Sequence, residues 1–440
     1  RARLGDDWDR IRALSIVEDD PDGHKYVRMA HLAVVASRRV NGVADVHSRL
    51  MREDLFRDLC ELAPDRFASV TNGVTPRRWL AYCNPGLRAL ISEAVGSEDW
   101  VRDLDLLREP LERAAEDPSF RARWVAARAP AKARALDFVA RAAGLPALDS
   151  AALLDVQVKR VCEYKRQLMN VLAVAHRYLA IRSTPPSERA ARFHGPRVCV
   201  LAGKAAPGYD TAKRVIKLAC AVAAAVNADP EVGAFLRMAF VPDYNVSVAE
   251  VLIPGADLSQ HISTAGTEAS GTGVMKCALN GVLVLGSRDG ANLELAREIG
   301  EENLFLFGGE AAEVAAARRA RRDQAAGPDA GDRPSSEHLD PRLKEVVEAV
   351  REGALFGWAD YFAPLMDAVC ASDEYLVGGD FAAYLDALDR ADAAFRDKDR
   401  WVRASILSTA RSGYFSSDRT IKQYATEIWN VEPMDDVNKT

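Results

Sequence analysis

The sequence contains no run of eighteen uninterrupted apolar residues, and its first residues do not resemble a signal peptide. We therefore expect no membrane-spanning segment and no membrane partner. The sequence also lacks an excess of basic residues, because its formal net charge is −6. Such a chain has no overall attraction for nucleic acid. Any phosphate site must then be a local cluster of basic residues.

Cysteine pairs are missing as well. The seven cysteines are scattered and form no C-x-x-C pair, and the seven histidines are equally dispersed. This pattern argues against a zinc site and favours reduced thiols in a cytoplasmic protein, so we expect no metal. Most of the histidines are expected to be structural or simply exposed.

Length and composition indicate a globular protein with more than one domain. The chain has 440 residues, of which 48% are hydrophobic and 28% are charged. This is enough for two or three domains with sizeable cores. The first residue is Arg1 rather than methionine, so we expect a processed product or a fragment of something longer.

The first part of the chain, residues 1–62, is predicted to be mainly helical. Within it, residues 26–37 are apolar on several faces, which is typical of a buried helix. Residues 72–79 contain Asn-Gly and Thr-Pro, which mark turns. We place the domain junction there, between a helical N-terminal part (1–72) and a larger second domain (73–440).

A different pattern starts near residue 152, where short apolar runs alternate with segments long enough for helices. The predicted strands are 153–158, 197–202, 236–241, 282–285 and 304–307, and the predicted helices include 166–181 and 212–226. This alternation predicts a parallel sheet covered by helices, in a doubly wound, Rossmann-like α/β domain. Ligands of such sheets bind beyond the carboxyl ends of the strands.

The last third of the chain combines a biased segment with further helices. Residues 308–340 are rich in Ala, Arg, Asp, Gly and Pro, and we predict a mobile surface loop there, chiefly in its second half. Residues 341–430 are predicted to be helical again. Ser417 or Asp418 can cap a final amphipathic helix, which we expect to pack back on the N-terminal part.

The most informative segment covers residues 263–276 and combines Glu268, three glycines, several hydroxyl groups and Lys276. Its glycines can expose backbone N–H groups to an oxyanion. Its lysine can neutralise a phosphate or form an imine with an aldehyde cofactor. The segment is neither a P-loop nor the dinucleotide fingerprint. On chemistry alone, a tight loop that caps a helix is an equally good interpretation.

Two other clusters follow predicted strands. Lys159, Arg160 and Lys165, with Tyr164 beside them, place three cations within seven residues, which suits a dianionic phosphate. Taken alone, a solvated basic turn is the better interpretation of that cluster. The glycines and Lys204 of residues 203–209 form a tight loop, which is either a plain connection or a ligand contact.

Together these clusters resemble the α-glucan phosphorylases that act on glycogen, starch and maltodextrin. The words that carry the resemblance include Thr71-Asn-Gly-Val-Thr-Pro-Arg-Arg-Trp-Leu80, Val156-Gln-Val-Lys-Arg160, Glu163-Tyr-Lys-Arg-Gln-Leu168, Gly203-Lys-Ala-Ala-Pro-Gly-Tyr209, Glu268-Ala-Ser-Gly-Thr-Gly273, Asp289-Gly-Ala-Asn292 and Phe415-Ser-Ser-Asp-Arg-Thr-Ile421. They occur in the family's order from about residue 8 to about residue 432. The chain resembles the C-terminal half of these enzymes.

The resemblance implies the C-terminal half of a GT-B fold and a glycosyltransferase reaction. Orthophosphate would cleave an α-1,4-glucan and release α-D-glucose 1-phosphate with retention. Lys276 matches the lysine that holds pyridoxal 5′-phosphate as an imine, and the phosphate of this cofactor takes part in acid–base catalysis. The family forms homodimers in the cytoplasm, and some members are allosteric enzymes.

The resemblance also implies roles for the phosphate-binding residues. Lys159, Thr272 and Gly273 match the grip on the cofactor phosphate. Arg160 and Lys165 match the clamp on the substrate phosphate.

The sugar contacts follow in the same way. Glu268 and the backbone N–H groups of Ala269, Ser270 and Gly271 match the cradle for the 3- and 4-hydroxyls of glucose. Tyr164 matches a contact to the 2-hydroxyl and Asn72 a contact to the 6-hydroxyl. Tyr244 matches a residue near the cofactor.

The sequence departs from the family at four points. Most of the long N-terminal domain, which forms the opposite wall of the cleft, is absent. Arg38 stands where a histidine near the sugar is expected, Cys162 replaces a histidine beside the phosphate clamp, and Val274 replaces an asparagine. We therefore keep two hypotheses: a phosphorylase chain that needs its missing half, and a non-catalytic fragment or pseudoenzyme that binds the cofactor or glucan. A nucleotide-sugar glycosyltransferase is a third, weaker alternative, because Lys276 argues against it.

Overall fold

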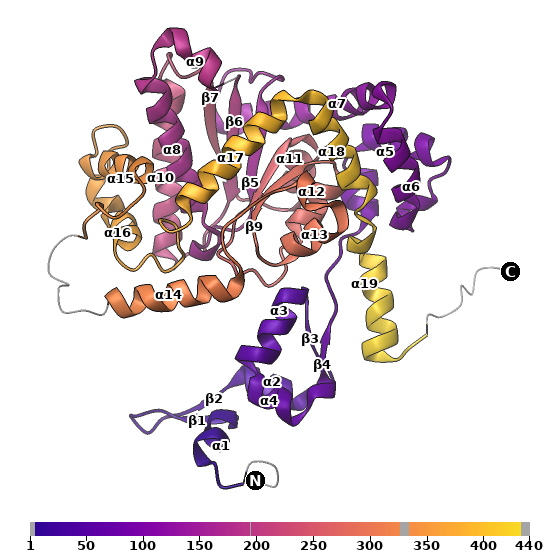
Figure 1. Cartoon of the computed structure of the whole chain (residues 1–440), viewed down its shortest axis with the longest axis vertical. Helices are drawn as coiled ribbons and strands as arrows, with labels where there is room; N and C mark the ends of the chain where they lie inside the picture. Colours follow the sequence, from indigo (N-terminus) through magenta and orange to yellow (C-terminus); the bar gives the residue numbers. More distant parts are fainter. Residues whose placement is uncertain (1–4, 194, 326–333, 433–440) are drawn as a thin grey trace.

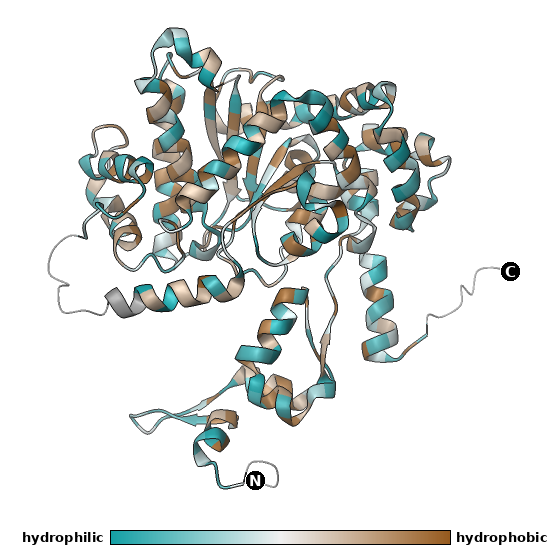
Figure 2. Cartoon of the chain, in the orientation of Figure 1, coloured by the Kyte–Doolittle hydropathy of each residue, from teal (hydrophilic) through white to brown (hydrophobic). Residues whose placement is uncertain are grey.

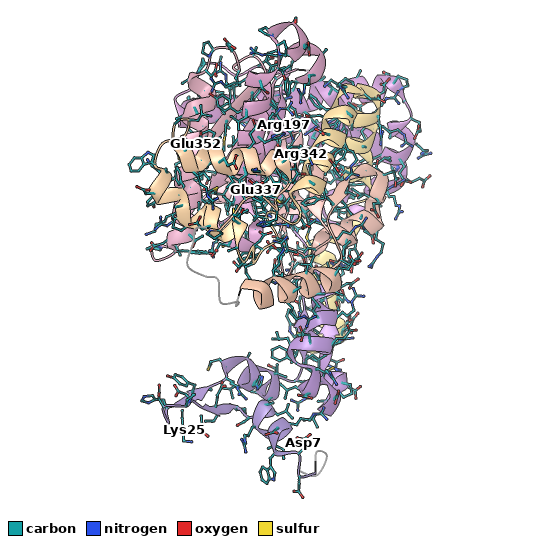
Figure 3. The ribbon with its side chains drawn as sticks, turned by 60° about the vertical axis from the view of Figure 1, so that its left-hand side comes forward. Asp7, Lys25, Arg197, Glu337, Arg342 and Glu352 are labelled. Atoms are coloured by element: carbon teal, nitrogen blue, oxygen red, sulfur yellow. The ribbon has the colours of Figure 1, made fainter. Side chains whose placement is uncertain are left out.

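The computed structural model describes residues 5–193, 195–325 and 334–432. It consists of a large α/β body and a small N-terminal lobe that projects from it (Figure 1). In Figure 3 the labelled residues Asp7 and Lys25 lie on this lobe, away from Arg197 in the body.

The body is built on one six-stranded sheet in which every neighbouring pair is parallel. In spatial order the strands are β10 (Phe305–Phe307), β9 (Leu283–Ser287), β8 (Leu258–His261), β5 (Leu153–Val158), β6 (Arg197–Gly203) and β7 (Leu236–Pro242). The strand order therefore runs outward in both directions from the pair formed by β5 and β8. This reversal is the switch point at which doubly wound sheets bind their ligands.

Helices cover both faces of the sheet, because the strands are apolar on both sides (Figures 1 and 2). In β5, Leu153 packs into one core and Leu154 into the other. The first face carries α8 (Gln167–Ser183), α10 (Asp210–Ala228), α15 (Pro341–Glu352), α16 (Ala359–Cys370) and α17 (Phe381–Arg396). The second carries α5 (Pro85–Val95), α6 (Arg108–Ala115), α7 (Pro118–Ala143), α11 (Val246–Gly255), α12 (Gly273–Leu279), α13 (Ala291–Ile299) and α18 (Lys398–Ala410).

The expectation of a parallel, helix-covered sheet is confirmed, and all five predicted strands are present within a residue or two at each end. The sixth strand, β8, was not predicted. Three of the four residues in its sequence Leu-Ser-Gln-His are polar, and these polar residues are nevertheless buried. Apolar patterning cannot reveal such a strand, because tertiary hydrogen bonds replace hydrophobic burial. The pairing with a second domain that defines a GT-B fold stays a prediction.

The N-terminal lobe differs from the mainly helical prediction, because it contains two small sheets. Antiparallel β1 (Val17–Asp19) and β2 (Lys25–Val27) form one, and parallel β3 (Val40–Gly42) and β4 (Phe67–Ser69) form the other. The lobe's helices are α1 (Trp8–Leu14), α2 (Met29–Ala36), α3 (Asp45–Leu50) and α4 (Arg57–Leu62).

The prediction of a buried helix in residues 26–37 was wrong. In α2 only Val34 is buried, and Met29 is 67% exposed. The lobe's core is small, consisting of Val34, Leu59, Phe67 and a few half-buried neighbours, so one face of α2 is enough to complete it. Leu32 and Val35 on its other faces are exposed as well.

The predicted loop 308–340 also differs from the structure. Helix α14 (Ala311–Ala325) occupies its first half, so that part is not a loop. An alanine-rich stretch with arginines has high helix propensity, which outweighed the compositional bias. The loop predicted for the second half lies largely outside the described residues, since 326–333 are not among them. Helix α9 (Pro186–Phe193) lies elsewhere, between α8 and β6.

The C-terminal segment returns to the domain junction. Helix α19 (Ser417–Gln423) is capped by Ser416, not by Ser417 or Asp418 as predicted, since the Ser416 hydroxyl accepts from the Asp418 N–H. Ser416 also pairs with Val74 in an isolated β-bridge. The Thr420 hydroxyl donates to the Thr71 carbonyl at 3.0 Å, and Asn41 donates to the Tyr424 hydroxyl at 2.8 Å. These bonds tie the small lobe to the body through the last helix.

The described residues contain neither a helix long and apolar enough to cross a membrane nor a group of three or more potential metal ligands. All seven cysteines are free thiols.

Replacing Gly73 with alanine should destabilise the junction. A Cβ at this position would meet the Ser416 carbonyl oxygen at 2.4 Å and the Ser417 nitrogen at 2.6 Å. Because these contacts are backbone atoms, relief requires the bridge to open, and we expect a loss of about 2 kcal/mol or more, measured by urea unfolding. Gly208→Ala is the control, since nothing lies within 4 Å of its Cβ position. Equal stability of both variants would contradict this account.

Candidate active site

The candidate site lies at the carboxyl ends of the two central strands. Lys159 directly follows β5, and the glycine-rich segment 263–276 leads from β8 into α12. The Thr264 N–H donates to the Tyr164 carbonyl at 2.9 Å, which joins the two connections. Segments far apart in the sequence thus meet at the switch point of the sheet.

Lys159 points toward the end of β8. Its Nζ lies 3.5 Å from His261 Nδ1, and His261 Nε2 lies 3.0 Å from the Ser259 hydroxyl. Burial lowers the pKa of Lys159 to about 8, and the nearby Lys165 contributes in the same direction. Burial, with Lys159 beside it, also holds the pKa of His261 well below its usual value. His261 is therefore a neutral ring that leaves the ammonium of Lys159 available for an anion.

Lys165 forms an ion pair with Glu268, and both side chains are largely buried. The ammonium also lies 4.6 Å from the centre of the Tyr164 ring. Burial lowers the pKa of Lys165, but the hydrogen bonds to Glu268 and Tyr164 outweigh this and raise it overall. Lys165 is therefore positively charged at neutral pH. It is paired with Glu268, the residue that matches the family's sugar contact.

Asp289, in the loop after β9, organises the segment around Glu268. Its Oδ2 accepts from the Ser263 hydroxyl at 2.9 Å and from the Glu268 N–H at 2.8 Å. Its Oδ1 accepts from the Gly266 and Gly290 N–H groups, both at 2.9 Å. A completely buried carboxylate therefore fixes the backbone that presents Glu268.

The following residues expose a row of backbone donors. In the part of the chain that the structure describes, no acceptor lies within hydrogen-bond distance of the N–H groups of residues 269–272. Gly271 has a φ of +83°, and Gly290 approaches so closely that a Cβ would lie 2.7 Å from the Glu268 carbonyl. Such a turn can receive hydroxyl or phosphate oxygens.

The N-terminal lobe and the junction also contribute to the site. Asn72 donates to the Ser270 hydroxyl at 3.1 Å, and His47 Nε2 lies 3.1 Å from Asp289 Oδ1. The buried Glu294 of α13 accepts from the Asp45 N–H and from the Thr71 hydroxyl. The lobe is thereby anchored to the same loops that carry the candidate sugar cradle.

Lys276 lies on α12 and is half-buried. Its Nζ lies 4.0 Å from the centre of the Trp79 ring, and burial lowers its pKa. Tyr244 is half-buried against the same core, and burial raises the pKa of its hydroxyl. A lysine with a lowered pKa is a better nucleophile toward an aldehyde.

Other residues singled out in the sequence are less involved. Arg160 is exposed, and Arg38 is exposed on the small lobe just after α2. Val274 is buried in the core behind the segment, where it packs as an ordinary apolar residue. Cys162 is half-buried, and burial raises the pKa of its thiol, so it does not act as a thiolate near neutral pH.

These residues fit pyridoxal 5′-phosphate. Lys276 offers an amine with a lowered pKa, Trp79 and Tyr244 offer aromatic surface, and Lys159 offers a cation without an acidic partner at hydrogen-bond distance. Unsatisfied N–H groups at 271 and 272 lie next to Gly273, whose hypothetical Cβ is 3.3 Å from His261. The donor set suits a dianionic phosphate ester that carries an aldehyde.

Sequence reasoning missed three residues that shape this site. His261 belongs to the unpredicted strand β8. Asp289 was recognised only as part of a family word, and its role as a shared acceptor depends on tertiary contacts. Arg166 is completely buried and donates to the Ile262 and Ser263 carbonyls and to Asp380. In the sequence Arg166 directly follows Lys165 and looks like one more cation of that basic cluster. Nothing in the sequence therefore indicated its structural role.

The charge on Lys159 predicts a pH dependence of anion binding. Because its pKa is lowered to about 8, the positive charge is present below pH 8 and is lost as the pH rises through this value. We expect the affinity for pyridoxal 5′-phosphate to fall about tenfold between pH 7 and pH 9.5, as one charge-assisted contact is lost. Fluorescence titration measures this, and Lys159→Arg should remove most of the dependence. The same fall in both proteins would contradict the assignment.

Comparison with known proteins gives a consistent result. A family model described as carbohydrate phosphorylase matches residues 1–431. The cytosolic α-glucan phosphorylase 2 of Arabidopsis thaliana is 46% identical over 430 residues, which cover 96% of this chain and 49% of the relative.

Two further relatives come from other plants. The H isozyme of α-glucan phosphorylase from Vicia faba is 47% identical, over 92% of this chain and 47% of its own. The chloroplastic/amyloplastic L-1 isozyme of Solanum tuberosum is 45% identical, over 93% and 42%. The chain thus spans about half the length of the relatives it matches. On the strength of the family match over nearly its whole length, the chain belongs to the carbohydrate phosphorylase family.

Proposed function

We propose that this chain carries the cofactor- and phosphate-binding half of an α-1,4-glucan phosphorylase, which converts glucan and orthophosphate to α-D-glucose 1-phosphate with retention. One observation carries the proposal. Lys159 and Lys165, with distinct environments, lie at the switch point of a parallel sheet, where a turn of unsatisfied N–H groups leads into the helix that carries Lys276. This arrangement offers separate places for an aldehyde, two phosphates and a sugar.

Each of the three lysines would bind a different group. Lys276 would attach pyridoxal 5′-phosphate, and Lys159, with the backbone at Thr272 and Gly273, would hold its phosphate. Lys165 and Arg160 would hold orthophosphate, Arg160 by turning its exposed side chain inward. When bound, the cofactor supplies a phosphate monoester whose second pKa near 6 allows proton exchange with orthophosphate near neutral pH.

Glu268 and its neighbours would orient the sugar. The carboxylate would accept hydrogen bonds from sugar hydroxyl groups, and the N–H groups of Ala269, Ser270 and Gly271 would donate to hydroxyl oxygens. Tyr164 and Asn72 would complete the cradle. Asp289 fixes the loop so that these groups are in place before the sugar arrives.

The ion pair between Lys165 and Glu268 has to loosen when both ligands bind. Orthophosphate would take Lys165, while the sugar hydroxyls would take Glu268. Each ligand thus frees a group for the other, which favours binding of both together. Orthophosphate would then protonate the departing glycosidic oxygen, so no pair of protein carboxylates is needed.

Activity is proposed for the assembled cleft rather than for this chain alone. The described residues form one wall, and we propose that a further segment or chain supplies the other wall, which excludes water. Homodimer formation and a cytoplasmic location are likewise proposals, since the relatives' names include both cytosolic and chloroplastic proteins. The alternative is a non-catalytic chain that binds pyridoxal 5′-phosphate or glucan.

The deciding experiment is an assay of the chain with pyridoxal 5′-phosphate, maltodextrin and orthophosphate, with and without the N-terminal half of a relative. We expect glucose 1-phosphate only in the complemented mixture. No product in either, with cofactor and glucan still bound, would favour the non-catalytic alternative. Product from this chain alone would refute the need for a second wall.

A further inference from the structure

A second charged cavity lies near the opposite, amino-terminal end of the sheet from the candidate active site. It has a volume of about 380 Å³ and is lined by residues of β5, β6, α8, α17 and α15. Arg197, the first residue of β6, forms part of its wall, and Arg342 of α15 forms another part. Both are labelled in Figure 3, on the body of the molecule. None of the residues assigned to phosphate, cofactor or sugar lines this cavity.

The lining is strongly charged and on balance positive. It contains five arginines and three aspartates, a difference of two positive charges. Arg192 and Arg396 are exposed, whereas Asp155 and Arg197 are buried, so the cavity connects the surface with the sheet. A volume above 300 Å³ is sufficient for a small metabolite.

Ion pairs hold the side chains of the cavity in place. Asp155 Oδ2 accepts from Arg197 at 2.9 Å and from Gln260 at 2.8 Å. Asp392 binds Arg177 at 2.6 Å and Arg197 at 2.8 Å. The walls are therefore preorganised by a network that reaches from β5 to α17.

Three buried polar atoms of this network have no hydrogen-bond partner. They are Asp155 Oδ1, His176 Nδ1 and Arg177 Nε, and their residues all line the cavity. Asp155 is only 2% exposed. Buried polar atoms are satisfied in nearly all native proteins, so each unsatisfied atom needs an explanation. None of the three atoms is accessible to solvent in this structure, so a ligand that both accepts and donates reaches them only when the side chains that line the cavity move apart.

We propose that this cavity binds a small hydroxylated phosphate monoester, such as a sugar phosphate, at a site separate from the strand-end site. The phosphate would lie among Arg177, Arg342 and His176. Both guanidinium groups are already paired, Arg177 with Asp392 at 2.6 Å and Arg342 with Asp340 at 2.9 Å, so the phosphate would share them with these carboxylates. A hydroxyl of the ligand donates to Asp155 Oδ1, the unsatisfied acceptor. A bare anion gains nothing from Asp155, because the carboxylate repels it.

Calorimetric titration with ribose 5-phosphate tests the proposal, on the whole chain with its strand-end site first filled by pyridoxal 5′-phosphate and reduced with borohydride. We expect saturable binding that weakens about tenfold or more in Arg177→Met, because a charge-assisted contact to the phosphate is lost. Arg342→Met should weaken binding in the same direction, and it serves if Arg177→Met fails to fold. Arg182→Met is the matched control, since Arg182 lies on the same helix outside the cavity and pairs with Asp229. It should bind normally.

Two further measurements distinguish this cavity from the strand-end site and a hydroxylated ligand from a bare anion. In the chain whose strand-end site is empty, Lys159→Met should remove only the ribose 5-phosphate that binds there and keep the binding that Arg177→Met loses; loss of all binding in Lys159→Met, with retention in Arg177→Met, would overturn the proposal. Sulfate, a dianion without a hydroxyl group at neutral pH, should bind more weakly than ribose 5-phosphate, and Asp155→Asn should reduce that difference. Equal affinity for both would refute the contact to a hydroxyl. Absence of saturable binding at millimolar ribose 5-phosphate would refute the site.

Discussion

Replacing Lys276 with methionine should abolish the covalent retention of pyridoxal 5′-phosphate. After reduction with borohydride, we expect about one label per chain in the unaltered protein and none in Lys276→Met. The reason is that burial lowers the pKa of Lys276, so that its amine is neutral more often than that of an exposed lysine. The Trp79 ring, 4.0 Å from Nζ, keeps the side chain in place. Mass spectrometry of the labelled peptides measures the result.

The control for this experiment is Lys204→Met. Lys204 follows β6 in a neighbouring loop, but it is exposed and pairs with Asp243 at 3.1 Å, so its removal should not affect labelling. Lys159 is the informative competitor, because its pKa is also lowered, to about 8. A label that maps to Lys159 in the unaltered protein would overturn the assignment of Lys276 and reverse the two roles.

Replacing Asp289 with alanine should have the largest effect on stability. Four donors from Ser263, Gly266, Glu268 and Gly290 converge on this carboxylate at 2.8 to 2.9 Å. Removal leaves several buried donors unsatisfied, each at a cost of about 1–3 kcal/mol, partly recovered by relaxation. We expect the free energy of unfolding to fall by about 3–5 kcal/mol, measured by urea denaturation.

Asp386→Ala provides the comparison for Asp289→Ala. Asp386 is 72% exposed on α17 and lies 3.8 Å from Arg342, so its loss should change stability by less than about 0.5 kcal/mol. The stability of Asp289→Asn should lie between those of the two alanine variants. Its amide oxygen still accepts hydrogen bonds, but its NH2 group is a donor that faces other donors. A stability of Asp289→Ala within 1 kcal/mol of the unaltered protein would show that the loop is held by other contacts.

The small lobe shows where apolar patterning misleads. The sequence of α2 is apolar all round, which in a larger domain indicates a buried helix. Here the helix has too little chain around it, and Met29 stays exposed while Val34 alone is buried. The hydrophobic pattern of a segment shows which residues it can bury, whereas the tertiary structure determines which of them are buried.

Strand β8 shows the opposite failure. Its residues Ser259, Gln260 and His261 look like a loop, yet all three are buried. Gln260 bonds to Asp155, and Ser259 to His261, so tertiary hydrogen bonds stabilise what hydrophobic burial would not. Because this strand forms half of the switch point, its omission also hid His261 beside Lys159.

The sequence by itself determined three things. They are the motifs that carry the family resemblance, the alternation that predicts a parallel sheet, and the cations and the acid that follow its strands. These depend on local composition and spacing, which are readable without the fold. Only the tertiary structure decided that Lys165 pairs with Glu268, that His261 lies against Lys159, and that Asp289 fixes the turn. Each of these contacts joins residues more than twenty positions apart, and burial lowers the pKa of Lys159 and of His261. Separation in sequence carries no information about such pairs, because the strand order that brings them together is set by packing of the whole sheet.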